Sequence, residues 1–206
     1  MKRIIMGAIA VISILFLVAC GNAPKKAGMY IEKAELSQQE ENIAKLLGDN
    51  GDQLIYDFKL DDTIQSVQVN TYRLIDGKWS MISGGGGHQF SDSKGRLALD
   101  FENLAEGLRV ALQSEHNSGS TTISSEPVEE FTGMGRVTSI LNEATEIAYE
   151  KEIPLVIQIS TAQSSIYSYD VDYFFTPDEY EKHGYEHIYA ITILFSQKTV
   201  GELSTY

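Results

Sequence analysis

Apolar residues recur at every second position over much of the chain from residue 53 onward. Successive side chains of a β-strand point to opposite faces, so a period of two predicts strands that each bury one face. The predicted strands are short and are separated by turn-forming residues, of which Asp76-Gly77 predicts a two-residue hairpin. This arrangement predicts a mainly β fold, an antiparallel β-sandwich with one short N-terminal helix. We expect strands over residues 54–60, 67–71, 78–82, 97–101, 108–113, 121–124, 153–159, 168–175 and 188–195.

The clearest helical pattern covers residues 36–47. Ser37 and Glu40 have the spacing of a capping box, in which each residue satisfies a backbone N–H group of the other. Ile43, Leu46 and Leu47 lie on one side of this predicted helix. Because so short a helix is marginal in water by itself, we expect it to dock on a neighbouring surface.

Residues 137–149 fit two interpretations. Ile140, Leu141 and Ala144 have helical spacing, whereas residues 145–149 followed by a charged triplet have the pattern of a strand and turn. We favour the strand. Because two half-length domains would each have a small core, the chain after its first residues is best interpreted as one domain.

The first nineteen residues have the composition of an export signal. Lys2 and Arg3 precede an apolar run that ends at Ala19 and is shorter than the roughly 20 residues of a membrane-spanning helix. The segment Leu17-Val18-Ala19-Cys20 then resembles the lipobox of bacterial lipoproteins. The resemblance implies that Cys20 is acylated and that residues 1–19 are removed as a signal peptide. It also implies a lipid anchor on the extracytoplasmic face of the cell membrane.

This resemblance divides the chain into three parts. We expect residues 1–19 to be the signal peptide, residues 20–33 a lipidated tether and residues 34–206 the β-sandwich domain. The domain itself resembles only bacterial lipoproteins of uncharacterised function. Cys20 is the one Cys of the chain, so an exported protein of this sequence has no internal disulfide available.

The net charge of the mature part limits the classes of partner that it can bind. Removal of residues 1–19 takes away two of the 16 basic residues and none of the 29 acidic ones, which leaves 187 residues with a formal charge of −15. Such a surface repels phosphate backbones, so we expect no nucleic-acid partner. It also repels anionic lipid, so the acyl group on Cys20 has to supply the membrane contact.

Two motifs are similar to known catalytic or ligand-binding patterns, but both are better explained as structural elements. The run from His183 to His187 fits H-x-x-E-H, a pattern of zinc proteases that needs both His on one turn of a helix. A strand-like segment follows at once, and in an extended chain the two His lie about 13 Å apart. The Gly-rich stretch 84–87 lacks the Gly-Lys-Ser/Thr ending of a phosphate loop and predicts a hairpin loop or a bulge. We therefore expect no catalytic residue, no metal and no cofactor.

Tyrosine is concentrated in the last quarter of the chain. If residues 168–175 form a strand, the side of Tyr169, Val171, Tyr173 and Phe175 packs inward because burying aromatic rings is favourable. A surface patch for ligand binding then remains, composed of Phe174, Tyr180, Tyr185, Asp170 and Asp172. Aromatic rings beside carboxylates suit either a sugar or a basic peptide. The alternative is that Phe174 packs beneath residues 177–185 and all three rings are buried.

The sequence thus favours a non-catalytic binding module at the cell envelope. Its expected partners are the membrane, through the lipid on Cys20, and an envelope protein or glycan. The alternative is an envelope hydrolase with a metal or carboxylate site, for which Asp170 and Asp172 on one strand face are the carboxylate candidates.

Overall fold

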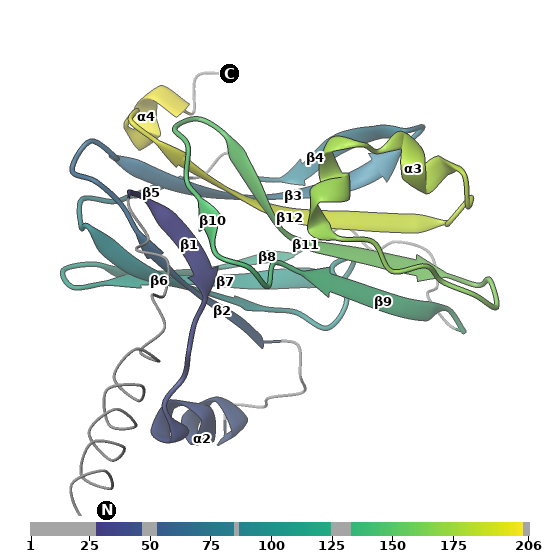
Figure 1. Ribbon diagram of the computed structural model, residues 1–206, viewed down its shortest axis with the longest axis horizontal. Coiled ribbons are helices and arrows are strands. Elements are labelled where there is room, and N and C mark those ends of the chain that lie inside the picture. Colours follow the sequence, from purple (N-terminus) through teal and green to yellow (C-terminus); the bar gives the residue numbers. More distant parts are fainter. Residues whose placement is uncertain (1–27, 47–52, 85–86, 125–132, 204–206) are drawn as a thin grey trace, which may run out of the picture.

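A computed structural model describes residues 28–46, 53–84, 87–124 and 133–203, and it shows two antiparallel sheets packed face to face (Figure 1). Of the described residues, 49% lie in strands and 14% in helices, which confirms the predicted mainly β sandwich. Cys20 and the lipobox lie outside the described residues.

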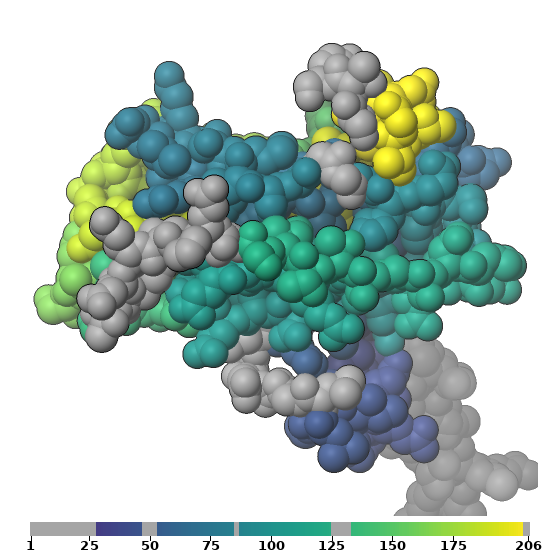
Figure 2. All heavy atoms as spheres, turned by 180° about the vertical axis from the view of Figure 1, so that it is seen from behind, coloured from purple at the N-terminus to yellow at the C-terminus, as the bar shows by residue number. Residues whose placement is uncertain are grey.

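The first sheet, sheet A, has the strand order β10-β1-β2-β6-β7-β8. The second, sheet B, has the order β4-β3-β12-β11-β9, and β5 also pairs with β3. The helix α2 stands outside both layers, on the sheet A side (Figures 1 and 2). The strands of sheet A are β1 (Tyr30–Lys33), β2 (Gln53–Lys59), β6 (Lys94–Asp100), β7 (Gly107–Ser114), β8 (Ser118–Ser124) and β10 (Thr145–Glu146). Those of sheet B are β3 (Ser66–Ile75), β4 (Lys78–Ser83), β5 (His88–Gln89), β9 (Gly135–Ile140), β11 (Glu152–Thr161) and β12 (His187–Ser196).

The main core lies between the two sheets, where alternate residues of each strand meet. Phe58 of sheet A packs against Phe195 of sheet B with ring centroids 5.3 Å apart. The hydroxyl of Tyr56 in β2 donates a hydrogen bond of 3.3 Å to the carbonyl of Leu155 in β11. These buried contacts join the two layers, as the period of two in the sequence predicts.

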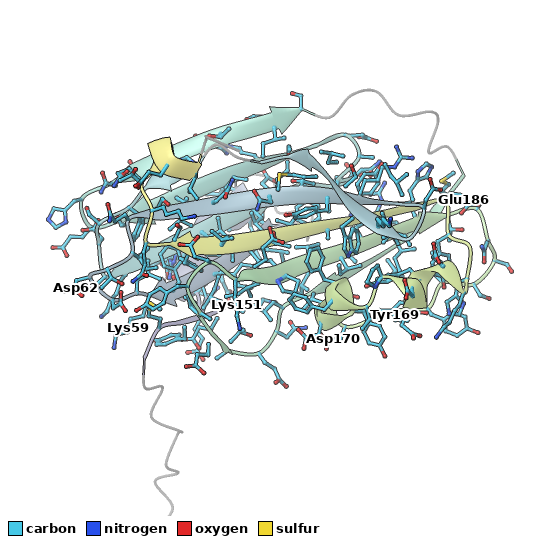
Figure 3. The ribbon with its side chains drawn as sticks, turned by 90° about the horizontal axis from the view of Figure 1, so that it is seen from above. Lys59, Asp62, Lys151, Tyr169, Asp170 and Glu186 are labelled. Carbon is cyan, nitrogen blue, oxygen red and sulfur yellow. The ribbon has the colours of Figure 1, made fainter. Side chains whose placement is uncertain are left out.

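Sheet B has a second buried face, because a long crossover covers its outer side (Figure 3). This crossover connects β11 to β12 through a 3₁₀ helix, η1 (Val171–Phe175), and a short helix, α3 (Asp178–Glu181). Strand β12 lies between β3 and β11, and nearly all its residues are buried. Apolar residues on both faces of a strand are typical of such a central position.

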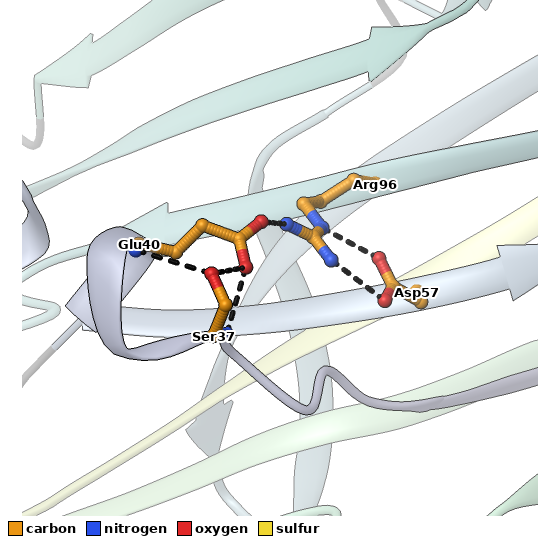
Figure 4. Close-up of polar contacts among 4 residues, drawn as sticks. All are labelled: Ser37, Glu40, Asp57 and Arg96. Carbon is orange, nitrogen blue, oxygen red and sulfur yellow. Dashed lines mark hydrogen bonds and ion pairs between the residues drawn. The ribbon is translucent and has the colours of Figure 1, made fainter.

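Helix α2 (Gln38–Leu46) is capped as the sequence predicts (Figure 4). The hydroxyl of Ser37 donates to a carboxylate oxygen of Glu40 at 2.7 Å, and the backbone N–H of Ser37 donates to the same oxygen at 2.8 Å. The other carboxylate oxygen of Glu40 accepts from Arg96 in β6 at 2.6 Å, and Arg96 also makes two hydrogen bonds to Asp57 in β2. Polar contacts therefore hold α2 on the outer face of sheet A.

The apolar side of α2 does not dock on the sandwich, contrary to expectation. No residue of α2 is buried; Ile43 is 57% exposed and Leu46 is 85% exposed. The half-buried residues of the helix include Ala44, and Ile43 lines the groove between the helix and sheet A, whereas Leu46 points to solvent. Leu47 lies outside the described residues.

Several local predictions are confirmed. Asp76 and Gly77 form the turn between β3 and β4, where φ values of 48° and 70° place both residues in the left-handed region that a type I′ hairpin needs. Residues 121–124 belong to the edge strand β8, and residues 137–149 contain two strands and no helix. The hairpin loop or bulge predicted at the Gly-rich stretch falls partly outside the described residues, which omit 85–86; β4 before it and β5 after it both pair with β3.

One predicted boundary and one predicted strand are wrong. The predicted tether 20–33 ends too late, because residues 30–33 form β1 and pair with β2, and the side chain of Ile31 is fully buried. A strand of four residues shows too little alternation to stand out in a sequence. The strand predicted over residues 168–175 is also wrong, since residues 171–175 form η1.

Among the described residues, no helix combines the length and apolar character needed to cross a membrane.

Candidate binding surface

The crossover that covers sheet B carries the residues of the predicted ligand patch. Asp170 caps the start of its 3₁₀ helix η1, since its side chain accepts a hydrogen bond from the backbone N–H of Asp172. Thr176 caps the end of η1 and stands just before Pro177, and a residue that precedes proline disfavours helical angles. In a 3₁₀ helix positions i and i+3 share a face, and Val171 and Phe174 are accordingly the two buried residues of η1.

The three aromatic residues of the predicted patch are not at the surface. Tyr180 is 0%, Phe174 8% and Tyr185 9% exposed, so the prediction that they form an exposed patch is wrong. The ring of Phe174 stacks on Trp79 of β4 at 5.1 Å and meets Tyr72 of β3 edge to face at 5.5 Å. These rings form an inner aromatic layer, Tyr72, Trp79, Phe174, Tyr180 and Tyr185, that joins the crossover to the outer face of sheet B.

Hydrogen bonds fix this inner layer in register. The indole N–H of Trp79 donates to the carbonyl of Phe174 at 2.7 Å. The hydroxyl of Tyr185 accepts from the backbone N–H of Tyr167 at 2.9 Å. Burial raises the pKa of Tyr180, whose hydroxyl has no hydrogen-bond partner among the described residues. The inner layer is therefore structural, and the rings of Tyr180 and Tyr185 are buried within it.

A second set of rings lies above the inner layer and reaches solvent. Tyr167 is 59% and Tyr173 38% exposed, whereas Tyr169 and His183 are half-buried. Ring contacts make these four residues continuous: Tyr173 lies 4.9 Å from Tyr169, Tyr169 lies 5.9 Å from His183, and His183 lies 4.7 Å from Tyr167. We call Tyr167, His183, Tyr169 and Tyr173 the aromatic row.

The rings of the aromatic row are tilted against one another. The planes of Tyr169 and Tyr173 make an angle of 59°, and those of Tyr167 and His183 make an angle of 37°. Phe175, 60% exposed, extends the surface at the far end through its contact with Phe174. The surface thus presents ring faces and ring edges in alternation and no flat platform.

Carboxylates surround the aromatic row. Asp170 and Asp172 are exposed, as predicted, and Asp178 lies exposed in α3 (Figure 3 labels Tyr169 and Asp170). Lys182 is the one Lys or Arg between residues 162 and 186, and its ammonium contacts the carboxylate of Glu179 at 2.6 Å. Because that pair is neutral, the crossover has an excess of negative charge beside exposed rings.

Sequence reasoning missed the exposed rings because it assumed the wrong period. Tyr169, Tyr173 and Phe175 have strand-like spacing, and the prediction placed them inside. Two signals favour a helical turn instead. Asp170 can cap a helix start by accepting a hydrogen bond from the backbone N–H two residues later, and Pro177 marks the end of the turn soon afterwards. With a period of three, Val171 and Phe174 become the buried pair.

The residues of the H-x-x-E-H motif have separate partners in the structure. His183 belongs to the aromatic row, where its ring stacks on Tyr185 at 5.4 Å. His187 begins β12 and lies beside Arg73, with its Nδ1 3.4 Å from a guanidinium nitrogen. The carboxylate of Glu186 accepts a hydrogen bond from Thr161. Among the described residues, no group of three or more His, Cys, Asp or Glu side chains is placed to hold a metal ion.

A Ser-Asp-His cluster lies at the turn between β7 and β8, and the sequence analysis did not identify it. Asp92 accepts hydrogen bonds from the hydroxyl of Ser114 and from the ring of His116, the latter at 2.7 Å. A nucleophilic serine needs a base that takes its proton, with the acid behind that base. Here the carboxylate stands between Ser114 and His116, so the cluster fixes a turn and does not activate the serine.

His116 and His187 should titrate on opposite sides of 6.5, the ordinary pKa of a histidine side chain. The hydrogen bond and charge of Asp92 raise the pKa of His116, whereas burial and then Arg73 lower the pKa of His187. His116 thus adds stability that is complete below pH 6.5 and is lost as pH rises through its folded pKa. His187 costs stability as pH falls from 6.5 through its lowered pKa, because the unfolded chain then binds the extra proton.

Proton NMR of the imidazole Hε1 signals measures both midpoints. We expect the Asp92→Asn variant to return the midpoint of His116 toward 6.5 and to leave that of His187 unchanged. An unchanged His116 midpoint in that variant would contradict the assigned contact.

Comparisons with protein-family models, with curated proteins and with solved structures find no match to this chain. The surface described above is therefore interpreted from its own chemistry.

Proposed function

We propose that this chain is a lipid-anchored, extracytoplasmic binding module whose aromatic row takes a cationic segment of an envelope protein. The observation that carries the proposal is the continuous row of tilted, partly exposed rings beside Asp170 and Asp172, which form no ion pair with another described residue. The lipobox resemblance at Leu17–Cys20 supports the location, and acylation of Cys20 supplies the membrane partner.

Charge favours a cationic ligand. Ring faces attract Lys and Arg side chains, and an exposed cation–π contact is worth about 0.5–1 kcal/mol. Asp170 and Asp172 add Coulombic attraction at the same place, and the formal charge of −15 on the mature part steers cations toward it. The ligand therefore gains from both the rings and the carboxylates.

Ring geometry disfavours the glycan alternative. A sugar stacks its flat side on an exposed ring face, and a flat, extended glycan chain fits best on ring faces that lie in one plane. The angles of 59° and 37° between neighbouring rings of the aromatic row break that plane. A flexible cationic peptide can place successive side chains on tilted rings, so it fits the surface better.

Binding of two probes to the intact acylated protein in lipid nanodiscs tests the proposal. A synthetic peptide of alternating Lys and Gly should bind, and the affinity should fall with added salt because the contacts are exposed. A neutral N-acetylglucosamine oligomer should bind more weakly at the same concentrations. Stronger binding of the oligomer, unaffected by salt, would replace the peptide proposal with the glycan one.

Substitution of single rings should locate the site. We expect Tyr167→Ala and Tyr173→Ala each to weaken peptide binding by about two- to fivefold, the equivalent of one exposed cation–π contact. Tyr149→Ala is the matched control, since Tyr149 is 39% exposed and lies outside the crossover. Equal losses in all three variants, or none in any, would contradict the assignment of the aromatic row.

A further inference from the structure

Helix α2 presents an uncharged side to solvent. At 100° per residue, Gln39, Asn42, Ile43 and Leu46 share one side of the helix, and all four are exposed. Glu41 and Lys45 point elsewhere, and Glu40 is paired with Arg96. A chain whose mature part carries a formal charge of −15 thus keeps one projecting helix side free of charge, with two large aliphatic residues on it.

The orientation of this side is fixed by strong local contacts. The capping box with Ser37 and the Arg96 ion pairs hold α2 at its first turn (Figure 4). The helix leaves a groove of about 320 Å³ between itself and sheet A, which Ile55 and Ala98 line from the sheet and Ile43 lines from the helix, although Ile43 is still 57% exposed. Because α2 contributes no buried residue, the sandwich core does not need Leu46, whose 85% exposed side chain is free to contact a surface outside the domain.

The length of chain before β1 identifies that partner. Tyr30, the first residue of β1, lies ten positions after Cys20, and ten residues of extended chain span at most about 33–36 Å. Helix α2 begins five residues after β1 ends. If Cys20 is acylated, as the proposed function requires, the bilayer surface is always within reach of α2.

We infer that α2 rests on the bilayer, with Ile43 and Leu46 inserted at the headgroup boundary. This inference depends on the lipid anchor of the proposed function. Two aliphatic side chains would not bind a free protein to a membrane. Once the acyl anchor is in the bilayer, however, contact of α2 with the same bilayer is intramolecular, so a small favourable free energy of insertion suffices. An uncharged side suits this role in an acidic protein, because it avoids repulsion by anionic lipid.

Docking of α2 also sets the direction of the aromatic row. The crossover covers sheet B, and α2 lies on the opposite side of the sandwich, beyond sheet A (Figure 1). With α2 on the membrane, the aromatic row faces away from the lipid, toward partners in the envelope.

A fluorescent probe at Leu46 tests the inference in the intact acylated protein. Because acylation consumes the one native thiol, Leu46→Cys gives a unique site for the environment-sensitive dye NBD. In phosphatidylcholine vesicles that contain spin-labelled lipid, we expect the dye emission to be quenched, because an interfacial helix buries its apolar side about 5–10 Å into the headgroup boundary. The control, Ser165→Cys in the exposed part of the crossover, should show no quenching.

The outcomes separate the inference from the anchor. If the labelled protein floats with the vesicles and Leu46→Cys is no more quenched than Ser165→Cys, α2 does not rest on the bilayer, although the anchor stands. If the protein does not float, the anchor itself is refuted. A blue shift that grows with protein density and not with spin-labelled lipid would assign α2 to a second copy and overturn the inference.

A second substitution tests whether apolar contact drives docking. In the Leu46→Cys background, Ile43→Ser should reduce the quenching, while circular dichroism and the melting temperature stay unchanged because Ile43 is exposed. Undiminished quenching would contradict insertion of this helix side.

Discussion

Replacement of Phe174 by Ala should lower the free energy of unfolding by about 3–5 kcal/mol, the usual cost of removing a buried aromatic side chain. Phe174 packs against Trp79 and Tyr72 and joins the crossover to sheet B. Its neighbour Phe175 is 60% exposed, so Phe175→Ala should change stability by less than about 0.5 kcal/mol. The pair is a matched test, since the same side chain is removed at adjacent positions.

Thermal unfolding monitored by circular dichroism measures both variants. Each kcal/mol corresponds to roughly 2–4 °C in a domain of this size, so Phe174→Ala should lose at least about 6 °C. Peptide binding should respond in the opposite order, because only Phe175 is at the surface. Similar stabilities for the two variants would mean that the crossover is not packed on Trp79 as described.

The fold was predictable because alternation is a physical requirement of a half-buried strand. Leu54, Tyr56 and Phe58 are buried on one face of β2, as their spacing demands. The hairpin at Asp76-Gly77 follows equally from chemistry, because few residues tolerate positive φ. Such local rules act before any tertiary contact is known, so they can be applied to a sequence alone.

The binding surface was only partly predictable, because local spacing there fits two structures. The sequence pointed to the segment that carries the aromatic row, and Asp170 and Asp172 are exposed as expected. The rings were assigned to the wrong layers because Trp79 provides the surface on which Phe174 stacks, and Trp79 lies 95 positions away in the chain. A pairing over that distance is decided by the topology of sheet B, which no local pattern contains.

The orientation of α2 shows the same limit. Ile43 and Leu46 share a helix side, and a short amphipathic helix normally buries that side. Here Arg96 binds Glu40 and Asp57 together, and this ion-pair network turns the acidic first turn of the helix toward sheet A. A contact between residues 40 and 96 cannot be inferred from either segment, so the exposed aliphatic side emerges only in three dimensions.

Replacement of Cys20 by Ala should remove the lipid anchor of the protein. Each buried methylene of an acyl chain contributes about 0.8 kcal/mol, and two or more chains make anchoring stable. No described helix provides an alternative span, and the formal charge of −15 on the mature part repels anionic lipid. The lipobox resemblance further implies that the variant keeps its signal peptide, since cleavage follows acylation of the Cys.

Membrane fractionation with incorporation of a clickable palmitate analogue measures both effects. Asn22→Ala is the control: it changes the residue two positions later, retains Cys20 and should be acylated normally. If Cys20→Ala still yields a shortened, acylated, membrane-held product, the lipobox interpretation is wrong, and with it the basis for placing α2 on a bilayer. If acylation is lost and the uncleaved signal alone keeps the protein on the membrane, the anchor assignment stands. Trypsin added to a membrane preparation then decides whether α2 is shielded only when Cys20 carries lipid, because Lys45 offers a cleavage site beside Leu46.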